Sequence, residues 1–303
     1  MRILIAEDDP FSRRFLARTI TKWGYEVISA CDGAEAWEVL RRDDAPKLAV
    51  IDWVMPGMTG PELCRLVRQQ KASESTYIIM LTGKGQTDDL VEAMDAGADD
   101  FATKSTDVRE LKARLRAGKR IVELQDDLVR MATRDVLTGL WNRRAIFNAL
   151  ESEVARAERH STSVGVIMAD LDHFKQVNDI YGHAAGDAVL AEVAKRMGSA
   201  LREYDTSGRY GGEEFLVVLP DPICAEAATV AERIRSSVDR ELISYDGTPL
   251  SVSISCGVAV SNREQNLSSE ALIRAADIAM YQAKAQGRNR VSEASNKSAP
   301  MPI

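Results

Sequence analysis

Short apolar runs alternate with amphipathic stretches in the first part of the chain. Between the first two runs, Phe15, Leu16 and Ile20 recur with the spacing of a helix that buries one face. Strands that alternate with helices favour an α/β fold with a doubly wound parallel sheet. We therefore expect such a sheet, with strands at residues 2–6, 26–29, 48–51 and 77–81 and a short fifth strand that reaches Phe101.

Polar side chains stand where these predicted strands end, at Asp8, Asp52, Thr82 and Lys104. In a doubly wound sheet, ligands gather beyond the carboxyl ends of the strands. Three acids, Glu7 included, with a hydroxyl and a lysine can bind Mg²⁺ and accept a phosphoryl group. Asp52 is the natural acceptor, because carboxylates form aspartyl phosphates. The alternative is that the acids only cap helices in an unregulated α/β domain.

A different pattern follows in the second part of the chain. Residues 164–172 read Val-Gly-Val-Ile-Met-Ala-Asp-Leu-Asp, which predicts a buried strand that ends in acids. Residues 209–215 read Arg-Tyr-Gly-Gly-Glu-Glu-Phe, which predicts a tight Gly-Gly turn before another strand. If the two strands are neighbours, Asp170 and Glu213 converge on one metal beside backbone that a nucleotide can approach. The alternative is an ordinary hairpin with a solvated acidic edge.

The segment between the two patterns, residues 107–134, contains no Pro and a single Gly, which predicts one long helix. Its apolar positions admit two heptad registers with the spacing of a parallel coiled coil. One seam has Leu111, Leu115, Gly118, Val122, Gln125 and Val129, and the other has Ala117, Ile121, Leu124, Leu128 and Met131. Two seams of similar quality predict a bistable linker whose register phosphorylation selects. The alternative is a passive helical spacer.

Composition changes this picture little. The length of 303 residues suggests about two domains, and a net charge of −7 argues against a nucleic-acid-binding surface as the main function. The four cysteines lack metal-ligand spacing, and we expect Cys31 and Cys64 to be small buried hydrophobes. No apolar run approaches the ~20 residues of a membrane span, and Met1 leads directly into a strand without a signal peptide. We therefore expect a cytoplasmic protein with no membrane partner.

Residues 1–118 resemble a response-regulator receiver domain. The resemblance implies a cognate histidine kinase as partner and phosphoryl acceptance by Asp52. It implies that Mg²⁺ is bound by Glu7, Asp8, Asp52 and the Val54 carbonyl. It also implies that Thr82 and Lys104 contact the phosphoryl group and that Phe101 is an aromatic switch. The chain departs from the family after Lys104, where Ser105 and Thr106 stand in place of the usual proline. A cis peptide after the lysine is therefore not expected.

Residues 134–293 resemble the GGDEF-type diguanylate cyclases through five motifs in order. The motifs are Asp135-Val-Leu-Thr-Gly-Leu-Trp-Asn-Arg, the run from Asp170-Leu-Asp-His-Phe-Lys to Gly186-Asp187, Arg202-x-x-Asp205, Gly-Gly-Glu-Glu-Phe, and Ala283-Lys-Ala-Gln-Gly-Arg-Asn-Arg. The resemblance implies an α+β, nucleotidyl-cyclase-like domain. It implies the condensation of two GTP into cyclic di-GMP and two pyrophosphates. A helical coiled-coil linker over 107–133 is expected to join it to the receiver, and residues 294–303 to form a disordered tail.

Such a reaction needs a metal-activated 3′-hydroxyl and cations on the triphosphate. We expect Asp170, Glu213 and the Leu171 carbonyl to bind Mg²⁺, while Glu214 either activates the hydroxyl or binds a second ion. Lys284 and Arg288 lie one helical turn apart and suit the phosphates. The other candidate nucleotide contacts are Lys175, Phe174, Asn178, His183, Asp187, Arg209, Gly211 and Gly212.

Within this set, the family assigns guanine binding to Asn178 and Asp187. An aspartate can accept from both N–H groups of a guanine edge, so Asp187 favours guanine over adenine. His183 could be catalytic or structural, and we favour a structural role because a metal-activated hydroxyl needs no histidine base. Further along, Ile278, Met280 and Tyr281 are expected to form helix core.

The product has twofold symmetry, so two subunits that each hold one GTP must face each other, and we expect a homodimer. Arg202 and Asp205 match the family's R-x-x-D inhibitory site, which implies feedback inhibition by cyclic di-GMP, with Arg233 completing the site from the partner subunit. One alternative is a catalytically dead domain that senses GTP or cyclic di-GMP, against which the intact acids and phosphate cations argue. Another is a cyclase of relaxed purine specificity, against which Asp187 argues.

Overall fold

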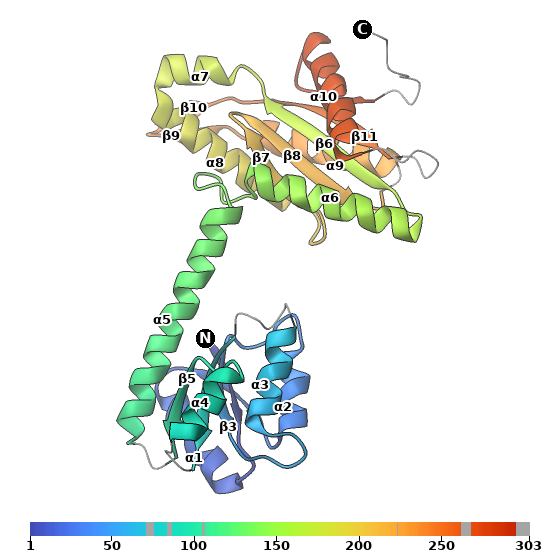
Figure 1. The fold of residues 1–303 in the computed structure, drawn as a ribbon. Coiled ribbons are helices and arrows are strands. Elements are labelled where there is room, and N and C mark those ends of the chain that lie inside the picture. The colour runs from blue at the N-terminus through green and yellow to red at the C-terminus, as the bar shows by residue number, and fades with distance from the viewer. Residues whose placement is uncertain (71–75, 84–86, 105–106, 223, 262–267, 295–303) are drawn as a thin grey trace. The chain divides into compact units, whose positions relative to one another are not determined.

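The computed structural model describes residues 1–70, 76–83, 87–104, 107–222, 224–261 and 268–294. The chain divides into two compact units, Met1–Val129 and Arg130–Ile303 (Figure 1). In the described residues, no helix is both long enough and apolar enough to cross a membrane. Residues 295–303 of the tail predicted at 294–303 lie outside the described residues, as does the peptide bond after Lys104.

The first unit is built on a five-stranded parallel sheet with the order β2-β1-β3-β4-β5. This confirms the predicted doubly wound α/β fold. The strands are β1 (Arg2–Ala6), β2 (Glu26–Ala30), β3 (Leu48–Asp52), β4 (Tyr77–Thr82) and β5 (Asp100–Thr103), and the helices between them are α1 (Pro10–Lys22), α2 (Gly33–Leu40), α3 (Gly60–Gln69) and α4 (Thr87–Asp95).

Local sequence signals place the helices near the strand ends. Helix α1 begins after Asp9, whose side chain accepts a hydrogen bond from the Ser12 amide, and α3 begins with a capping box of Thr59 and Glu62. A Cβ at Gly60 would lie 2.4 Å from the Asp52 carbonyl oxygen. Glycine is therefore required where α3 approaches the carboxyl end of β3.

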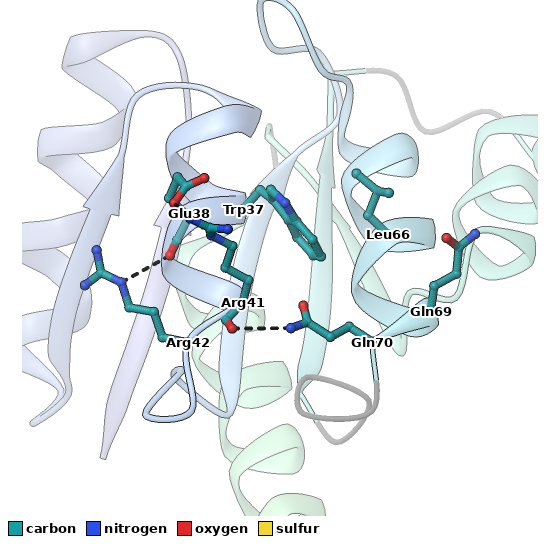
Figure 2. Close-up of a pocket in the computed structure, with 7 residues that line it drawn as sticks. All are labelled: Trp37, Glu38, Arg41, Arg42, Leu66, Gln69 and Gln70. Atoms are coloured by element: carbon teal, nitrogen blue, oxygen red, sulfur yellow. Dashed lines mark hydrogen bonds and ion pairs between the residues drawn. The ribbon is translucent and has the colours of Figure 1, made fainter. Parts of the chain in front are cut away.

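One surface pocket of this unit, with a volume of about 690 Å³, lies between α2 and α3 (Figure 2). Its polar groups bond largely to one another: the Arg41 guanidinium pairs with Glu38 at 2.6 Å, and the Gln70 amide donates to the Arg41 carbonyl at 3.3 Å. None of the predicted site residues lines it. Cys64 is buried as expected, but Cys31 is exposed because it lies beyond the last residue of β2.

Helix α5 (Val108–Thr133) contradicts the prediction of two interchangeable seams. Leu111, Leu115 and Val122 of the first seam are buried in the core of the first unit, and a Cβ at Gly118 would lie 2.5 Å from the Tyr77 ring. These positions are not available for pairing with another helix. The apolar side chains of the second seam are exposed, at Ile121, Leu124, Leu128 and Met131.

The second unit is an α+β domain, as predicted. Its main sheet has the order β12-β11-β6-β8-β7, with β11 and β12 parallel and the other neighbours antiparallel. The strands of this sheet are β6 (Val164–Leu171), β7 (Thr206–Gly211), β8 (Glu214–Pro220), β11 (Ile254–Val260) and β12 (Val291–Glu293); β9 (Ile243–Tyr245) pairs with β10 (Thr248–Leu250) in a separate hairpin. The helices are α6 (Arg143–His160), α7 (Phe174–Tyr181), α8 (His183–Ser199), α9 (Cys224–Asp239) and α10 (Ser269–Ala285).

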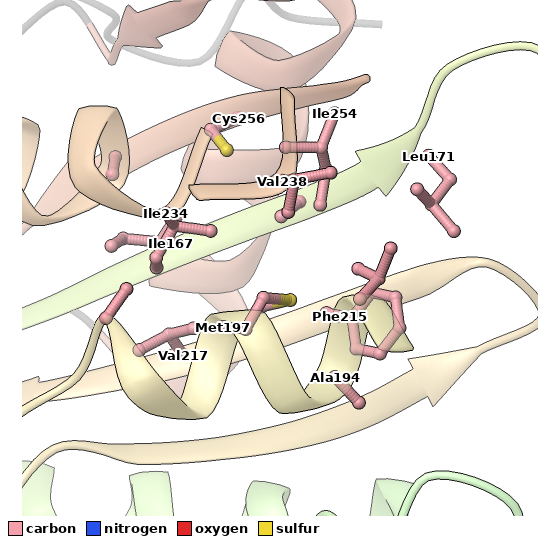
Figure 3. Close-up of a cluster of buried hydrophobic side chains, with 14 of the residues drawn as sticks. Ile167, Leu171, Ala194, Met197, Phe215, Val217, Ile234, Val238, Ile254 and Cys256 are labelled. Carbon is pink, nitrogen blue, oxygen red and sulfur yellow. The ribbon is translucent and has the colours of Figure 1, made fainter. Parts of the chain in front are cut away.

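The central strand β6 is buried on both faces, which explains its continuous apolar run. Side chains alternate between faces, so Ile167 packs with Phe215 and Met197 in one cluster while Met168 packs with Leu216 in another. Figure 3 shows the first cluster, where β6 and β8 meet α8 and α9. The end of β6 is therefore held rigidly from both sides.

The core prediction for α10 is correct at one position and wrong at two. Met280 is buried against the sheet, whereas Ile278 and Tyr281 are exposed. Helical geometry explains the difference, because Ala276, Ala279, Met280 and Ala283 already form the buried face. Ile278 and Tyr281 lie on other sides of the helix.

Candidate functional sites

The acids at the strand ends of the first unit lie together around one lysine. Ligand atoms of Glu7, Asp8 and Asp52 all lie within 4.8 Å of one another. The Lys104 ammonium donates to Glu7 Oε1 at 2.8 Å and to Asp52 Oδ2 at 2.7 Å. Asp52 and Glu7 are almost fully buried, while Asp8 is exposed.

Burial controls the electrostatics of this cluster. It raises the pKa of Asp52 above the usual aspartate value, and the hydrogen bond from Lys104 opposes the rise. It likewise raises the pKa of Glu7, whose Oε2 atom is buried without a hydrogen-bond partner among the described residues. Three hard oxygen donors with one left unbonded fit a Mg²⁺ ion.

The other predicted receiver residues lie after β3 or on the neighbouring strands β4 and β5. Thr82, at the end of β4, is buried, and its carbonyl accepts from the Lys104 amide at 2.7 Å. The Val54 side chain is exposed. Phe101 is half-buried on β5, and the Arg114 guanidinium of α5 lies 5.5 Å from its ring centre. The predicted switch residue thus contacts the long helix.

In the second unit, the two predicted acid-bearing strands are neighbours. Strands β6 and β8 pair antiparallel with Asp170 directly opposite Glu214, and the Leu171 amide donates to the Glu213 carbonyl at 3.4 Å. Lys284, in the last turn of α10, contacts Asp170 Oδ1 at 2.8 Å. The structure therefore brings Asp170, Glu213, Glu214 and Lys284 together.

The Gly-Gly turn differs from its prediction by one residue. Gly211 pairs with Glu214, so the turn residues are Gly212 and Glu213. Gly212 adopts a positive φ of 48°, and a Cβ there would meet no atom within 4 Å. A bulge between Arg209 and Gly211 shifts the register and places Glu213 in the turn.

Burial at the strand end raises the pKa of Asp170 to about 6. The hydrogen bond and positive charge of Lys284 oppose this rise, and the charges of Glu213 and Glu214 add to it. Burial also raises the pKa of Glu214, with a contribution from the negative charge of Asp277. Carboxylate oxygens are the donors that a hard divalent ion such as Mg²⁺ prefers, but among the described residues only Glu7, Asp8 and Asp52 form a group of three acids with ligand atoms within 4.8 Å of one another.

Helices α7 and α8 carry the predicted guanine contacts. A Cβ at Gly186 would lie 2.0 Å from Asn178 Oδ1 and 3.1 Å from the Phe174 ring. The absence of a side chain at Gly186 therefore sets the position of Asn178 beside the first turn of α8, where Asp187 is exposed. Lys175 and His183 are also exposed, so a packing role for His183 is not supported.

Two of the three predicted inhibitory residues, Arg202 and Asp205, line a pocket of about 590 Å³. Asp205 Oδ2 accepts from the Arg202 amide at 2.8 Å, and the Arg202 guanidinium donates to the Tyr204 hydroxyl at 2.8 Å. Arg156 from α6 also lines this pocket. Arg233 does not line it, and its Nε donates instead to the Ala200 carbonyl.

Sequence reasoning missed two roles that depend on pairing across the fold. The Arg209 guanidinium donates to the Gly212 carbonyl at 2.8 Å and pairs with Asp135 at 3.3 Å. It therefore ties the Gly212–Glu213 turn to the start of the second unit rather than facing a ligand alone. Arg156 belongs to no motif, and only the approach of α6 to the pocket reveals it.

A family model described as diguanylate cyclase, GGDEF domain, matches residues 132–290, more than half of the chain. The chain belongs to this GGDEF family. A second model, the response regulator receiver domain, matches residues 3–116.

The chain is similar to a bacterial response regulator and to a bacterial diguanylate cyclase. It is 32% identical over 299 residues to the response regulator PleD of Caulobacter vibrioides, covering 96% of this chain and 65% of that protein. It is 43% identical over 173 residues to diguanylate cyclase A of Treponema denticola, covering 56% of this chain and 46% of that protein. The chain thus spans less than two thirds of the length of these relatives.

Solved structures give the same picture. The coiled coil and GGDEF domain of DgcB from Caulobacter crescentus, in complex with c-di-GMP, matches with a TM-score of 0.55 at 34% identity, covering 61% of this chain and 99% of that one. Diguanylate cyclase SiaD of Pseudomonas aeruginosa matches with a TM-score of 0.52 at 40% identity, covering 62% of this chain and 73% of that one.

Asp170→Asn is expected to stabilise the metal-free second unit at pH 8. The folded-state pKa of about 6 lies above the ordinary value of 3.8, so the charged carboxylate destabilises the folded state above pH 6. The gain should be on the order of 1–3 kcal/mol at pH 8 and should vanish as the pH falls from 6 towards 4. Thermal unfolding across this pH range, with exposed Glu151→Gln as control, measures it. A lower melting temperature for Asp170→Asn at pH 8 contradicts the prediction.

Lys104→Ala is expected to destabilise the first unit by up to a few kcal/mol, because it leaves Glu7 and Asp52 buried without their cation. Millimolar Mg²⁺ should raise the melting temperature of this variant more than that of the wild type. The surface variant Lys119→Ala serves as control. An equal Mg²⁺ effect on Lys104→Ala and the wild type would argue against a cation site among these acids.

Proposed function

We propose that this protein is a Mg²⁺-dependent diguanylate cyclase that condenses two GTP into cyclic di-GMP and two pyrophosphates. One observation carries the proposal most directly. Asp170 and Glu214 face each other on paired strands, with Glu213 in the adjoining turn and Lys284 at 2.8 Å from Asp170. The acids expected to bind the metal and the lysine expected to contact phosphate therefore lie at one strand end, in a member of the GGDEF family.

The residues divide the chemistry between them. Asp170, Glu213 and the Leu171 carbonyl would hold Mg²⁺, which when bound polarises the 3′-hydroxyl and neutralises phosphate charge. Lys284 pairs with Asp170 at 2.8 Å and would contact the triphosphate from this position. Arg288 is exposed at the same helix end and would contact the phosphates beside it.

Guanine recognition would fall to Asn178 and Asp187. Asn178 is positioned against Gly186, the residue before Asp187. An amide and a carboxylate placed together can read the acceptor and donors of one guanine edge. This arrangement favours GTP over ATP as the substrate.

The reaction requires a homodimer, because one subunit supplies only one nucleotide to a twofold-symmetric product. The exposed apolar stripe of Ile121, Leu124, Leu128 and Met131 on α5 would form the helix pair. This stripe replaces the two-seam arrangement, since the other seam is buried in the first unit over residues 111–122.

We infer that phosphorylation of Asp52 by a cognate histidine kinase activates the cyclase. The acid cluster with Lys104 supports phosphoryl acceptance at Asp52. Phe101 supports coupling, because Arg114 of α5 lies over its ring and also pairs with Asp100. A change at Phe101 would therefore reach the helix that leads to the second unit.

Pyrophosphate release from GTP and Mg²⁺ tests the proposal, with and without a phosphoryl mimic at Asp52. Turnover that disappears in Glu213→Gln and rises with the mimic supports it. Light scattering on the same samples reports whether activation accompanies dimer formation. Absence of pyrophosphate release under all conditions contradicts the cyclase activity.

Gly186→Ala is expected to raise the KM for GTP about tenfold, because the new methyl group would displace Asn178 from its position. Gly198→Ala on the same helix is the matched control, since a Cβ there would meet no atom within 4 Å. The control should leave KM unchanged and stabilise the protein by about 0.5–1 kcal/mol. Equal KM values for the two variants contradict the placement of guanine beside Asn178.

Arg202→Ala is expected to raise the concentration of cyclic di-GMP needed for half-maximal inhibition by about tenfold or more. The reason is that Arg202 supplies a planar cation to the pocket that it shares with Asp205 and Arg156. Turnover without product should persist, and exposed Arg159→Ala on α6 is the control. Unchanged inhibition of Arg202→Ala would exclude this pocket as the feedback site.

A further inference from the structure

Two consecutive residues after α10 adopt a left-handed backbone although neither is glycine. Arg288 has a φ of 61° and Asn289 a φ of 45°. For such residues this conformation costs free energy, and it persists only where surrounding contacts enforce it. Strain of this kind at Arg288 stands out, because this residue is a proposed phosphate contact.

The end of α10 ties the strained pair to the turn that carries Lys284, the partner of Asp170. Helix α10 ends at Ala285, so Arg288 lies beyond it rather than on one helical face with Lys284. Gly287 has a φ of 118°, and the Arg288 amide donates to the Ala283 carbonyl at 3.1 Å. The Gly287 amide approaches the Lys284 carbonyl at 3.4 Å, which completes a Schellman-type ending. The backbone of Arg288 is thereby fixed relative to Lys284 on the preceding turn.

Asp172 enforces the conformation from the sheet. This buried side chain accepts hydrogen bonds at Oδ2 from the Asn289 amide at 3.0 Å and from the Ser253 hydroxyl at 2.7 Å. Its Oδ1 accepts from the Ser255 hydroxyl at 2.7 Å. Asp172 thus joins the end of β6 to the start of β11 and to the strained pair, and the proposed chemistry gives it no other role.

Asn289 is anchored a second time by α9. Its side-chain oxygen accepts from Arg235 at 2.7 Å, and its side-chain amide donates to Asp239 at 3.1 Å. Asparagine tolerates the left-handed region better than most residues, which suits it to this position. Backbone and side chain of Asn289 are therefore both held, and Arg288 lies between this anchor and the helix end.

We propose that Asp172 is a positioning residue for the triphosphate, acting through Asn289 to hold Arg288 beside Lys284. The inference rests on the proposed function, in which Arg288 contacts phosphate. Asp172 itself touches no substrate atom. Its carboxylate accepts from the Asn289 amide and keeps Arg288 in a conformation that the chain would otherwise leave.

Calorimetric titration of the full-length protein with Mg²⁺ and a non-hydrolysable GTP analogue tests the role, with GMP as the ligand that lacks the β- and γ-phosphates. Asp172→Ala should weaken binding of the analogue about tenfold, because the Arg288 guanidinium would no longer be held where it contacts the phosphates. GMP binding should change by less than about twofold, because GMP lacks the β- and γ-phosphates that Arg288 would contact. Asp172→Asn keeps an acceptor for the Asn289 amide and should rescue binding of the analogue.

Two further variants separate positioning from general destabilisation. In an Arg288→Ala background, Asp172→Ala should add less than about twofold, because the residue that it positions is already absent. Asn289→Ala should also weaken binding of the analogue but not of GMP. This variant tests the positioning role if Asp172→Ala fails to fold.

Any one of three results overturns the inference. The first is unchanged analogue binding in Asp172→Ala, or in Asn289→Ala if Asp172→Ala does not fold. The second is equal weakening of analogue and GMP binding, and the third is full additivity of the effects of Asp172→Ala and Arg288→Ala on analogue binding. Failure of the wild type to bind the analogue or to release pyrophosphate from GTP contradicts the proposed function instead. The two failures are therefore distinguishable.

Discussion

A buried carboxylate at the end of a central strand is the constraint on which the second unit depends. Strand β6 is covered on both faces, so Asp170 at its end cannot move into solvent without disturbing the core. Burial raises its pKa to about 6, and Lys284 supplies the compensating positive charge. The site therefore stores an unfavourable interaction that a divalent cation would relieve.

The first unit solves the same problem in the same way. Glu7 and Asp52 are buried at strand ends, and Lys104 bridges them at 2.8 and 2.7 Å. In both units a lysine neutralises clustered acids, and phosphate chemistry is proposed at that place. The similarity is one of physical solution rather than of fold, because one sheet is parallel and the other mostly antiparallel.

Hydrophobic patterning was sufficient for the fold class of the first unit and for single strands of the second, whose α+β fold was predicted from motifs shared with a known family. Continuous apolar runs such as 48–51 and 164–169 predicted strands buried on both faces, and the structure confirms them. Hydrophobic patterning gave wrong predictions where it could not show which part of the protein an apolar helix face packs against. Leu111, Leu115 and Val122 fit a coiled-coil seam, but the core of the first unit takes them. Tyr281 fits a helix core, but smaller residues already fill that face of α10.

The sequence by itself determined which chemical groups the protein has and which strand ends carry them, because motif order and side-chain period are properties of the chain alone. Only the tertiary structure decided which groups meet. The bulge at Arg209 and Gly211 moves Glu213 into the turn, α6 brings Arg156 to the pocket of Arg202 and Asp205, and Asp172 reaches Asn289 across more than a hundred residues. Such contacts depend on strand register and helix approach, which arise from packing between segments far apart in the chain.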